Sequence, residues 1–353
     1  MNYKETDKNF IYTKKAGQYV YRNCLDFTLE GFAWHDENKN FHRLPERIYP
    51  ELREDLICVA NNSAGGVVRF KTDSKSIALR CSYEAMRDSS GMPNSAESGF
   101  DLYRKDSDGL NFVVNIRPEP GEKSLDMTAD IKSHTGETEE YYLYMPVYSA
   151  VKELEIGFEP GSIAEPAEQR PRSERVVFYG SSITNGGCTS RPGMTYPAVF
   201  CREFDTQAVN LGFSGNALGE AVIADEISKL DCALIVVEYD HNNTLEGLKE
   251  THEPFIRHIR KNNKSVPIIV ASRVVYADQT DEEIKRRDVI YTTYKNAVEN
   301  GDNNIYFLDG AAYFTGKNRT DYTADGVHPN DAGFKKMADC LAEFCRKNSI
   351  LKR

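Results

Sequence analysis

The second half of the chain alternates short apolar runs with longer amphipathic stretches. The apolar runs are rich in β-branched residues and have the length of buried strands; they lie at residues 176–179, 208–211, 233–237, 266–271 and 305–308. The amphipathic stretches predict helices at residues 195–205, 217–229, 244–261, 282–300 and 331–347. Strands separated by helices pair in parallel, and the helices cover both faces of the sheet. The pattern therefore predicts an α/β fold over residues 175–353, a flavodoxin-like doubly wound parallel sheet.

The first part of the chain has a different pattern. Short runs with near alternation of apolar and polar residues are separated by clusters of Gly, Asn, Asp, Ser and Pro; the runs lie at residues 10–13, 18–21, 56–59, 67–72, 77–81, 112–116, 141–145 and 154–158. Many short strands bounded by turn residues are typical of a sandwich or jelly roll. We therefore expect an all-β sandwich domain over residues 1–160.

Residues 161–174 separate these two regions. They are rich in proline and charge and have no hydrophobic period, which is typical of a semi-rigid linker. A chain of 353 residues also exceeds the size at which a single hydrophobic core stops growing. We therefore expect two domains with their boundary in this segment.

Charge and composition exclude several classes of function. The net charge of −10 repels phosphate backbones, so nucleic acid is not an expected partner. No apolar run reaches the roughly 18 residues that span a membrane, so no membrane partner is expected. The histidines lack the spacing of metal-binding pairs and the eight cysteines stand singly, so we expect reduced thiols and no metal site. The polar N-terminus does not resemble a signal peptide, which predicts a cytoplasmic location.

Polar residues follow the predicted strands where each strand ends. Ser182 follows the first strand, Gly215 the second and Asn242 the third, while Asp325 and His328 lie beyond the last. Because the carboxyl ends of parallel strands lie at one edge of a sheet, these positions are expected to converge. They supply a hydroxyl, a backbone amide, a side-chain amide, a carboxylate and an imidazole. Acyl transfer uses this set of groups.

The chemistry of acyl transfer assigns each group an expected role. A serine hydroxyl attacks an ester when a base takes its proton, and the base is commonly a histidine held by a carboxylate. Asp325 and His328 are three residues apart, so one turn brings their side chains together. We expect Ser182 as nucleophile, His328 as general base and Asp325 as the group that orients it. The N–H groups of Ser182 and Gly215 and the side-chain amide of Asn242 are expected to form the oxyanion hole.

Four segments resemble, in order, the four motif blocks of the SGNH hydrolase superfamily, also called GDSL hydrolases. They are Gly180-Ser-Ser-Ile-Thr184, Asn210-Leu-Gly-Phe-Ser-Gly215, Glu238-Tyr-Asp-His-Asn242 and Asp325-Gly-Val-His328. Gly99-Phe-Asp-Leu-Tyr103 also resembles the Gly-x-Asp-Leu-Tyr motif of a β-rich domain found ahead of one SGNH branch. That branch is similar in layout to carbohydrate acetyl esterases with an N-terminal jelly-roll domain. The resemblance implies a serine esterase with sugar-bound acyl groups as substrates.

Two positions depart from the family pattern. Ser181 stands where the family usually has Asp, and Asp240-His-Asn-Asn243 replaces Gly-x-Asn-Asp. The second change predicts a different backbone path for the loop that carries Asn242. The Gly-x-Ser-x-Gly elbow of α/β-hydrolases is absent, because Thr184 stands where its second glycine would fall. That fold is therefore not predicted.

The catalytic candidates also have structural interpretations, which the sequence leaves open. Ser182 and Asn242 are residue types that cap helices. Gly215 suits a backbone position with positive φ, and Asp325 with Gly326 suits an ordinary turn.

Four further residues are candidates for substrate contact. Trp34, the single tryptophan, either stacks on a sugar ring at the cleft between the domains or fills the sandwich core. Arg191 and Tyr196 either meet a substrate hydroxyl or carboxylate, or serve in a salt bridge and in packing. His241 either contacts substrate or is a hydrogen-bonded structural histidine.

Taken together, the residues predict a serine esterase that hydrolyses short acyl esters, with acetyl preferred, on an oligosaccharide or another small molecule. The steps need only proton transfers and water, so no cofactor is expected. The same triad permits acyl transfer to an acceptor other than water, which is the first alternative. The second is a carbohydrate-binding protein whose α/β domain has lost activity.

Overall fold

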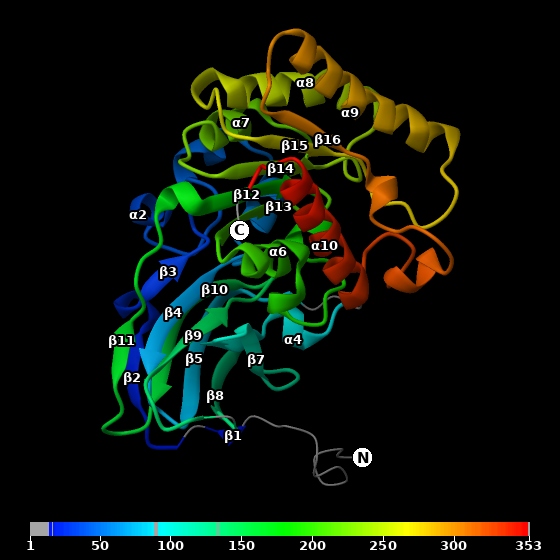
Figure 1. Cartoon of the computed structure of the whole chain (residues 1–353). Coiled ribbons are helices and arrows are strands. Elements are labelled where there is room, and N and C mark those ends of the chain that lie inside the picture. Colours follow the sequence, from blue (N-terminus) through cyan, green and yellow to red (C-terminus); the bar gives the residue numbers. More distant parts are fainter. Residues whose placement is uncertain (1–13, 16, 88–90, 133, 352–353) are drawn as a thin grey trace.

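The computed structural model describes residues 14, 15, 17–87, 91–132 and 134–351. Within them the chain forms three β-sheets: two antiparallel sheets in the lower part of Figure 1, and one parallel sheet with helices on both sides above them. The run expected as a strand at residues 10–13 lies outside the described residues. None of the described helices is long and apolar enough to cross a membrane.

The two antiparallel sheets pack face to face. Their strands are β1 Lys14–Lys15, β2 Val20–Asn23, β3 Thr28–Glu30, β4 Val67–Thr72, β5 Ser76–Ala85, β6 Phe100–Asp106, β7 Gly109–Ile116, β8 Ser124–Asp130, β9 Glu139–Tyr144, β10 Ala150–Phe158 and β11 Ala164–Pro166. One sheet has the order β1-β8-β5-β10-β2, and the other β11-β4-β9-β6-β7 with β3 beside β4. Phe70, Leu79, Leu102 and Ile156 are fully buried between the sheets. The predicted all-β sandwich is confirmed.

The third sheet contains the five strands expected in the second half of the chain. They are β12 Arg175–Gly180, β13 Gln207–Gly212, β14 Leu234–Glu238, β15 Ile268–Ala271 and β16 Ile305–Leu308. All pair in parallel in the order β13-β12-β14-β15-β16. This is the strand order of a flavodoxin-like doubly wound sheet, so the predicted fold class is confirmed.

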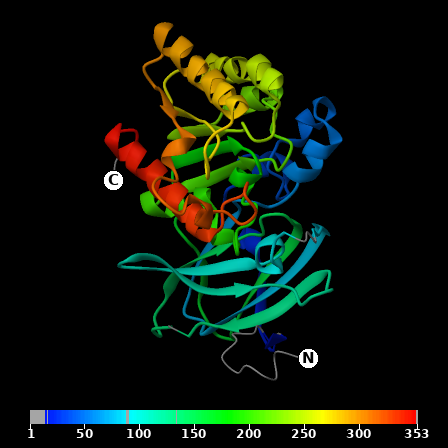
Figure 2. The ribbon, with the colours of Figure 1, turned by 90° about the vertical axis from the view of Figure 1, so that its right-hand side faces the viewer.

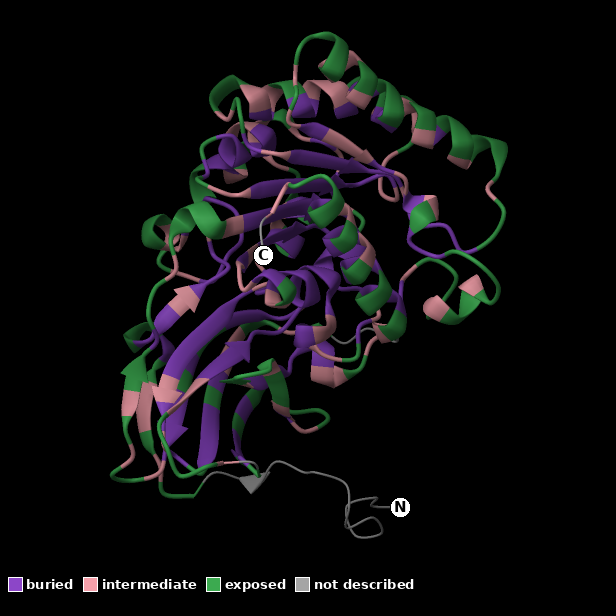
Figure 3. Ribbon diagram, in the orientation of Figure 1, coloured by how far each residue is buried: buried purple, intermediate pink, exposed green. Residues whose placement is uncertain are grey.

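Helices cover both faces of this sheet (Figure 1). The helices on these faces include α6 Tyr196–Phe204, α7 Ala221–Ile227, α8 Leu245–Asn262, α9 Asp281–Glu299 and α10 Asp331–Lys347. Successive residues of β12 point to opposite faces: Val177 packs with the cluster that α7, α8 and α9 complete, and Val176 with the cluster of α6 and α10. Figure 3 shows the strands buried and the outer faces of α8 and α9 exposed.

The remaining elements are short. They are α2 His35–Asn38, α3 Glu54–Ala60, α4 Asn94–Glu97, α5 Ser182–Asn185, and the 3-10 turns η1 Cys24–Asp26, η2 Glu46–Glu51, η3 Arg172–Glu174, η4 Pro192–Met194, η5 Gly310–Ala312 and η6 Arg319–Tyr322.

The strand predicted at residues 56–59 is wrong, because this run lies in helix α3. Leu56, Val59 and Ala60 have helical spacing and are buried together, whereas a strand would have placed successive residues on opposite faces. The helix packs against the parallel sheet in the same core as Val177. In Figure 2 the blue helices of this early segment stand beside the parallel sheet, above the sandwich.

The segment expected to be a linker is partly ordered as a strand. Ala164–Pro166 forms β11 and pairs with β4 at the edge of its sheet. Proline is tolerated there because an edge strand does not need every N–H for pairing. The carbonyl of Ala167 then accepts a hydrogen bond from Thr28. These contacts tie this part of the segment to the sandwich.

Candidate active site

Ser182 stands at the carboxyl end of β12, as the first residue of α5. The side chain of Ser181 caps this helix by accepting a hydrogen bond of 3.2 Å from the N–H of Ile183. Gly180 precedes it at a position without room for a side chain, since a Cβ would lie 2.1 Å from Thr184 Oγ1. The cap is therefore Ser181, and the hydroxyl of Ser182 remains available for another contact.

That contact is with His328. Ser182 Oγ lies 2.8 Å from His328 Nε2, and His328 Nδ1 lies 2.7 Å from Asp325 Oδ2. The turn that carries both residues is closed by Thr323, whose hydroxyl donates to the carbonyl of His328. The three residues expected to act together thus form one chain of hydrogen bonds.

Asp325 is held as a carboxylate. Partial burial opposes ionisation, but hydrogen bonds from the backbone N–H and the imidazole of His328 and from the N–H of Val327 lower the pKa of Asp325 to about 2. An ionised carboxylate at this position accepts a hydrogen bond from Nδ1–H, which leaves the lone pair of Nε2 directed at Ser182. This is the tautomer that a general base requires.

The expected oxyanion donors are the amides near the nucleophile. In the described part of the chain, the N–H groups of Ser182 and Gly215 donate to no protein acceptor. Gly215 has φ of 69°, which favours glycine. Asn242 Nδ2 donates at 2.9 Å to the carbonyl of Phe213, in the turn that contains Gly215, and this uses one of its two amide hydrogens.

A buried carboxyl group that the sequence reasoning missed lies next to this site. Glu238, at the end of β14, accepts a hydrogen bond of 3.1 Å from Ser181 Oγ. Burial, and then the negative charge of Asp240, raise the pKa of Glu238 to about 8. Asp240 itself pairs with Arg286 at 2.7 Å. An aspartate in place of Ser181 would add a third carboxyl group here, so the structure gives a reason for the departure from the family pattern.

A buried arginine, also missed, fixes the strand that leads to Gly215. Arg43 is 1% exposed and donates to the carbonyls of Asn210 and Gly212, at 3.0 and 2.7 Å, and to the side chain of Asn185. Burial lowers the pKa of Arg43 to about 9. No sequence signal indicated that a residue so early in the chain lies below the nucleophile helix.

Two of the expected substrate contacts are not placed to meet a substrate. Trp34 is 7% exposed and belongs to the core on the α7, α8 and α9 side of the parallel sheet, so it neither stacks at a cleft nor fills the sandwich. Tyr196 is 2% exposed, and its hydroxyl lies 2.9 Å from Thr184 Oγ1 in the core. Both rings complete a hydrophobic core, which fits the packing interpretation of Tyr196 but neither interpretation of Trp34.

The other two have structural contacts as well. His241 Nδ1 lies 2.9 Å from a guanidinium nitrogen of Arg273, which fits the structural interpretation. Burial and the charge of Arg273 lower the pKa of His241, so the ring is neutral. Arg191 pairs with Asp101 at 3.0 Å and covers the ring of Phe112 at 3.9 Å.

The contact of Arg191 explains the Gly-x-Asp-Leu-Tyr motif. Asp101 is fully buried and accepts hydrogen bonds from Arg191 and, at 2.8 Å, from the N–H of Gly193. The ring of Tyr103 fills the space above Gly193, where a Cβ would lie 2.5 Å from it. Motif residues of the sandwich therefore hold the loop that follows the nucleophile helix.

The same loop reaches the turn that carries His328. The N–H of Ser190 donates at 2.9 Å to Asp331, the first residue of α10. A Cβ on Gly187 would lie 3.0 Å from His328 Cδ2. The loop of residues 186–193 thus connects Asp101 of the sandwich with His328 and with the start of α10.

The sandwich also contributes to the surroundings of the oxyanion turn. The hydroxyl of Tyr148 donates to Ser214 Oγ at 3.2 Å, and Tyr148 packs with Met92 and Val147 in a small apolar cluster. The carbonyl of Val147 accepts from the side chain of Asn185, in the nucleophile helix. Residues of both halves therefore surround Ser182.

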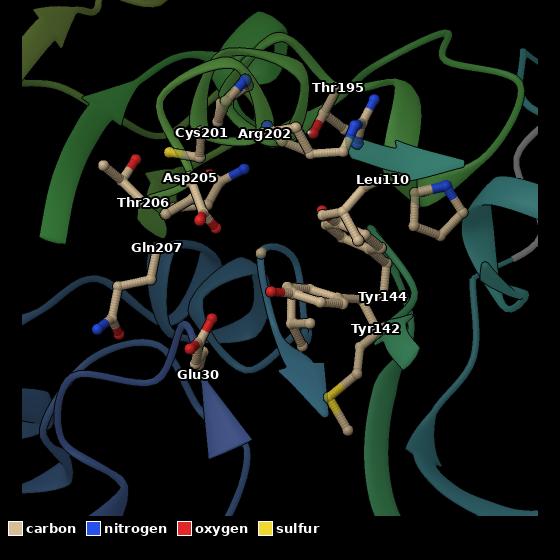
Figure 4. Close-up of a pocket in the computed structure, with 18 of the residues that line it drawn as sticks. Glu30, Leu110, Tyr142, Tyr144, Thr195, Cys201, Arg202, Asp205, Thr206 and Gln207 are labelled. Atoms are coloured by element: carbon tan, nitrogen blue, oxygen red, sulfur yellow. Dashed lines mark hydrogen bonds between the residues drawn. The ribbon is translucent and has the colours of Figure 1, made fainter. Parts of the chain in front are cut away.

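A separate cavity of about 30 Å³ lies between the sandwich and the α/β half (Figure 4). Its lining includes Tyr142, Tyr144, Arg170, Arg202 and Asp205, and none of the triad residues. That volume is room for one or two water molecules. The cavity is a gap in the interface and does not extend the active site.

Comparisons with known proteins match both parts of the chain. The model of the GDSL-like Lipase/Acylhydrolase family matches residues 173–346, and the model of the GxDLY domain, described as the N-terminus of Esterase_SGNH_hydro-type proteins, matches residues 18–163. A search of curated proteins found no match.

Solved structures share this fold over most of the chain. A protein described as a GDSL-like lipase from Bacteroides ovatus ATCC 8483 is 26% identical, with a TM-score of 0.87 over 95% of this chain and 99% of that one. The salicylyl-acyltransferase SsfX3 of a tetracycline biosynthetic pathway is 17% identical, with a TM-score of 0.79 over 96% and 99%. A family two carbohydrate esterase from Clostridium thermocellum is 16% identical, with a TM-score of 0.59 over 82% and 94%.

Proposed function

Because the chain belongs to the GDSL-like lipase/acylhydrolase family and carries a GxDLY domain ahead of the hydrolase domain, we propose that it is a serine esterase acting on short acyl esters. One observation carries the proposal. The hydrogen-bonded chain from Ser182 Oγ through His328 to Asp325, with links of 2.8 and 2.7 Å, is the arrangement that activates a serine hydroxyl.

In the first half of the reaction, Ser182 Oγ attacks the ester carbonyl while His328 Nε2 takes its proton. Asp325 stabilises the imidazolium that forms. The N–H groups of Ser182 and Gly215 and the free amide hydrogen of Asn242 donate to the oxyanion of the tetrahedral intermediate. His328 then gives its proton to the departing alkoxide, which leaves as the alcohol, and an acyl-enzyme remains on Ser182.

The second half repeats these steps with water. His328 takes a proton from a water molecule, whose oxygen attacks the acyl carbonyl. The collapse of the second intermediate breaks the bond to Ser182 Oγ, and His328 returns the proton to that oxygen. The products are the free acid and the regenerated enzyme. Every step is a proton transfer or an acyl transfer, so the proposed cycle needs no cofactor.

For the substrate we propose an acetyl ester on an oligosaccharide. Carbohydrate esterases share the fold of this chain. The sandwich brings Tyr148 next to the oxyanion turn, and we propose that this side chain limits the room for the acyl chain. The rate of hydrolysis should therefore fall from acetyl to butyryl to octanoyl esters.

The test is hydrolysis of 4-nitrophenyl acetate, butyrate and octanoate, with acetylated oligosaccharides alongside. Ser182→Ala should abolish turnover, while Ser107→Ala, in the exposed turn between β6 and β7, should leave it unchanged. Wild-type protein that is inactive on every ester would contradict the proposal. Sugar binding without turnover would then favour a binding protein.

Acyl transfer is the second candidate, because this chain shares its fold with an acyltransferase over 96% of its length. The acyl-enzyme is common to both reactions, and the acceptor decides between them. Adding an alcohol acceptor at increasing concentration and measuring free acid against new ester separates the two. Free acid as the main product supports hydrolysis, and new ester at the expense of acid supports transfer.

A further inference from the structure

Three side chains of metal-binding type meet on the outer side of the triad. Cys188 Sγ lies 3.9 Å from Asp325 Oδ2, which is itself 2.7 Å from His328 Nδ1. One ligand atom from each residue lies within 4.8 Å of the other two. The proposed catalytic cycle uses the carboxylate and the imidazole but gives no role to the thiol.

The backbone places the thiol at this position. Cys188 has φ of 68°, in the left-handed region that residues with a Cβ adopt rarely. It lies in the loop of residues 186–193, which the hydrogen bonds of Ser190 to Asp331 attach to α10. The loop thus presents the sulfur to the carboxylate of Asp325.

The cluster is open to solvent. Cys188 is half-buried, and the side chains of Asp325 and His328 are 46% and 25% exposed. An ion in solution can therefore approach the cluster from its exposed side.

Thiolate, imidazole and carboxylate are the three ligand types of protein zinc sites. With Zn–S of about 2.3 Å and Zn–N and Zn–O of about 2.0–2.2 Å, a tetrahedral site spaces its ligand atoms roughly 3.3–3.7 Å apart. Here the separation of sulfur and carboxylate is already close to this value. The carboxylate and the imidazole, now 2.7 Å apart, would separate by at least about 0.6 Å as the ion displaces the proton between them. The sulfur would approach the imidazole from a separation within 4.8 Å, and water would fill the fourth position.

We propose that Cys188, Asp325 and His328 form an inhibitory Zn²⁺ site that switches the enzyme off reversibly. Zn²⁺ takes the lone pair of His328 Nδ1, so the single proton of the neutral imidazole moves to Nε2. The thiol proton of Cys188 is released to solvent. Nε2 then carries a hydrogen and no longer accepts the proton of Ser182.

The inference goes beyond the proposed function, and its first test needs no turnover. Co²⁺ bound to a thiolate gives a charge-transfer absorption band, so Co²⁺ is titrated into the full-length protein. The band is expected in the wild type and in Ser182→Ala, because Ser182 is not a ligand, and it is expected to be absent in Cys188→Ala. Alanine keeps a Cβ at this position, so the backbone conformation is no more strained than with cysteine.

The second test is inhibition of ester hydrolysis by Zn²⁺. We expect the wild type to lose activity with Zn²⁺ and to regain it with a chelator. Cys188→Ala should keep the chelated rate within about threefold and should need at least about tenfold more Zn²⁺ for half inhibition, since even outer partners of metal ligands contribute 10–100-fold in affinity. Cys58→Ala removes an exposed thiol elsewhere and should behave as the wild type.

Two results would overturn the inference. One is a cobalt spectrum in which the wild type shows no thiolate band, or shows a band that Cys188→Ala also shows. The other is equal Zn²⁺ sensitivity of the wild type and Cys188→Ala. If no ester is hydrolysed, the spectrum still decides the question of the metal site, so failure of the proposed function and failure of this inference are distinguishable.

Discussion

The hydroxyl of Ser181 donates a hydrogen bond of 3.1 Å to the buried carboxyl group of Glu238, one residue before the proposed nucleophile. Ser181 also caps the nucleophile helix, so a single hydroxyl joins β14 to the start of α5. The protonation of Glu238 therefore affects the element that carries Ser182.

Glu238→Gln should remove a pH dependence of stability. Burial and Asp240 raise the pKa of Glu238 to about 8, against about 4.3 for an unfolded glutamate. Between these values the folded protein keeps a proton that the unfolded chain loses. The contribution is thus complete below about pH 4 and is lost as pH rises through about 8, at no more than about 1.4 kcal/mol per pH unit.

Urea denaturation at pH 5, 6, 7 and 8 measures this effect as the free energy of unfolding. Relative to Glu238→Gln, the wild type should lose stability steadily across the series. Glu246→Gln, at an exposed position of α8, is the control and should run parallel to the wild type. Parallel curves for the wild type and Glu238→Gln would show that this carboxyl group is not protonated in the folded protein.

Asp325→Asn should lower kcat by on the order of 10⁴-fold with little change in KM, because an amide no longer holds the imidazole in the required tautomer. The low pKa of Asp325, about 2, also means that its protonation does not reduce wild-type activity above about pH 4. Steady-state kinetics on 4-nitrophenyl acetate check both statements. Asp321→Asn, in the nearby turn η6, should keep wild-type rates. A loss of less than tenfold in Asp325→Asn would exclude the assigned role.

Asn242→Ala should reduce turnover by about 10²- to 10³-fold if the amide donates to the oxyanion. The variant also loses the hydrogen bond to the carbonyl of Phe213, so thermal unfolding is measured beside the kinetics. A folded variant that retains more than a third of the wild-type kcat would remove Asn242 from the mechanism.

Asp101→Asn should reduce kcat by about tenfold while KM changes little. The substitution removes the ion pair with Arg191, so the loop that contacts His328 loses part of its attachment. The rate falls because small displacements of a catalytic group have large kinetic costs. Asp106→Asn, at the exposed end of the same strand, is the matched control. Equal effects of the two substitutions on kcat would show that the motif serves the sandwich alone.

The periodicity of the sequence was enough to predict the parallel sheet, because buried strands and amphipathic helices differ in length and period. It failed at residues 56–59, where four apolar or small residues fit a strand and a helix turn equally well. The interpretation of Trp34 as a sandwich core residue failed with it, since helix α3 and Trp34 occupy the same core on the α7, α8 and α9 side of the parallel sheet.

Motif residues predicted which side chains gather at the triad, since strand ends converge by topology. The residues that support them were not predictable in this way. Glu238 ends an apolar run, and that is a weak sign of a buried carboxyl group, but nothing in the sequence pairs it with Ser181. The contacts of Arg43 join positions about 140 to 170 residues apart along the chain, and only the folded chain brings them together.

The position of Arg43 and α3 makes the catalytic half a discontinuous unit. Helix α3 completes the core on the α7, α8 and α9 side of the parallel sheet, and Arg43 donates to the end of β13. Both precede most of the sandwich along the chain. A truncation that starts at residue 175 would expose that core and remove the guanidinium under the nucleophile helix. Replacing the residues before 161–174 with another accessory domain would do the same. The two halves of this chain can therefore be moved to another protein only together.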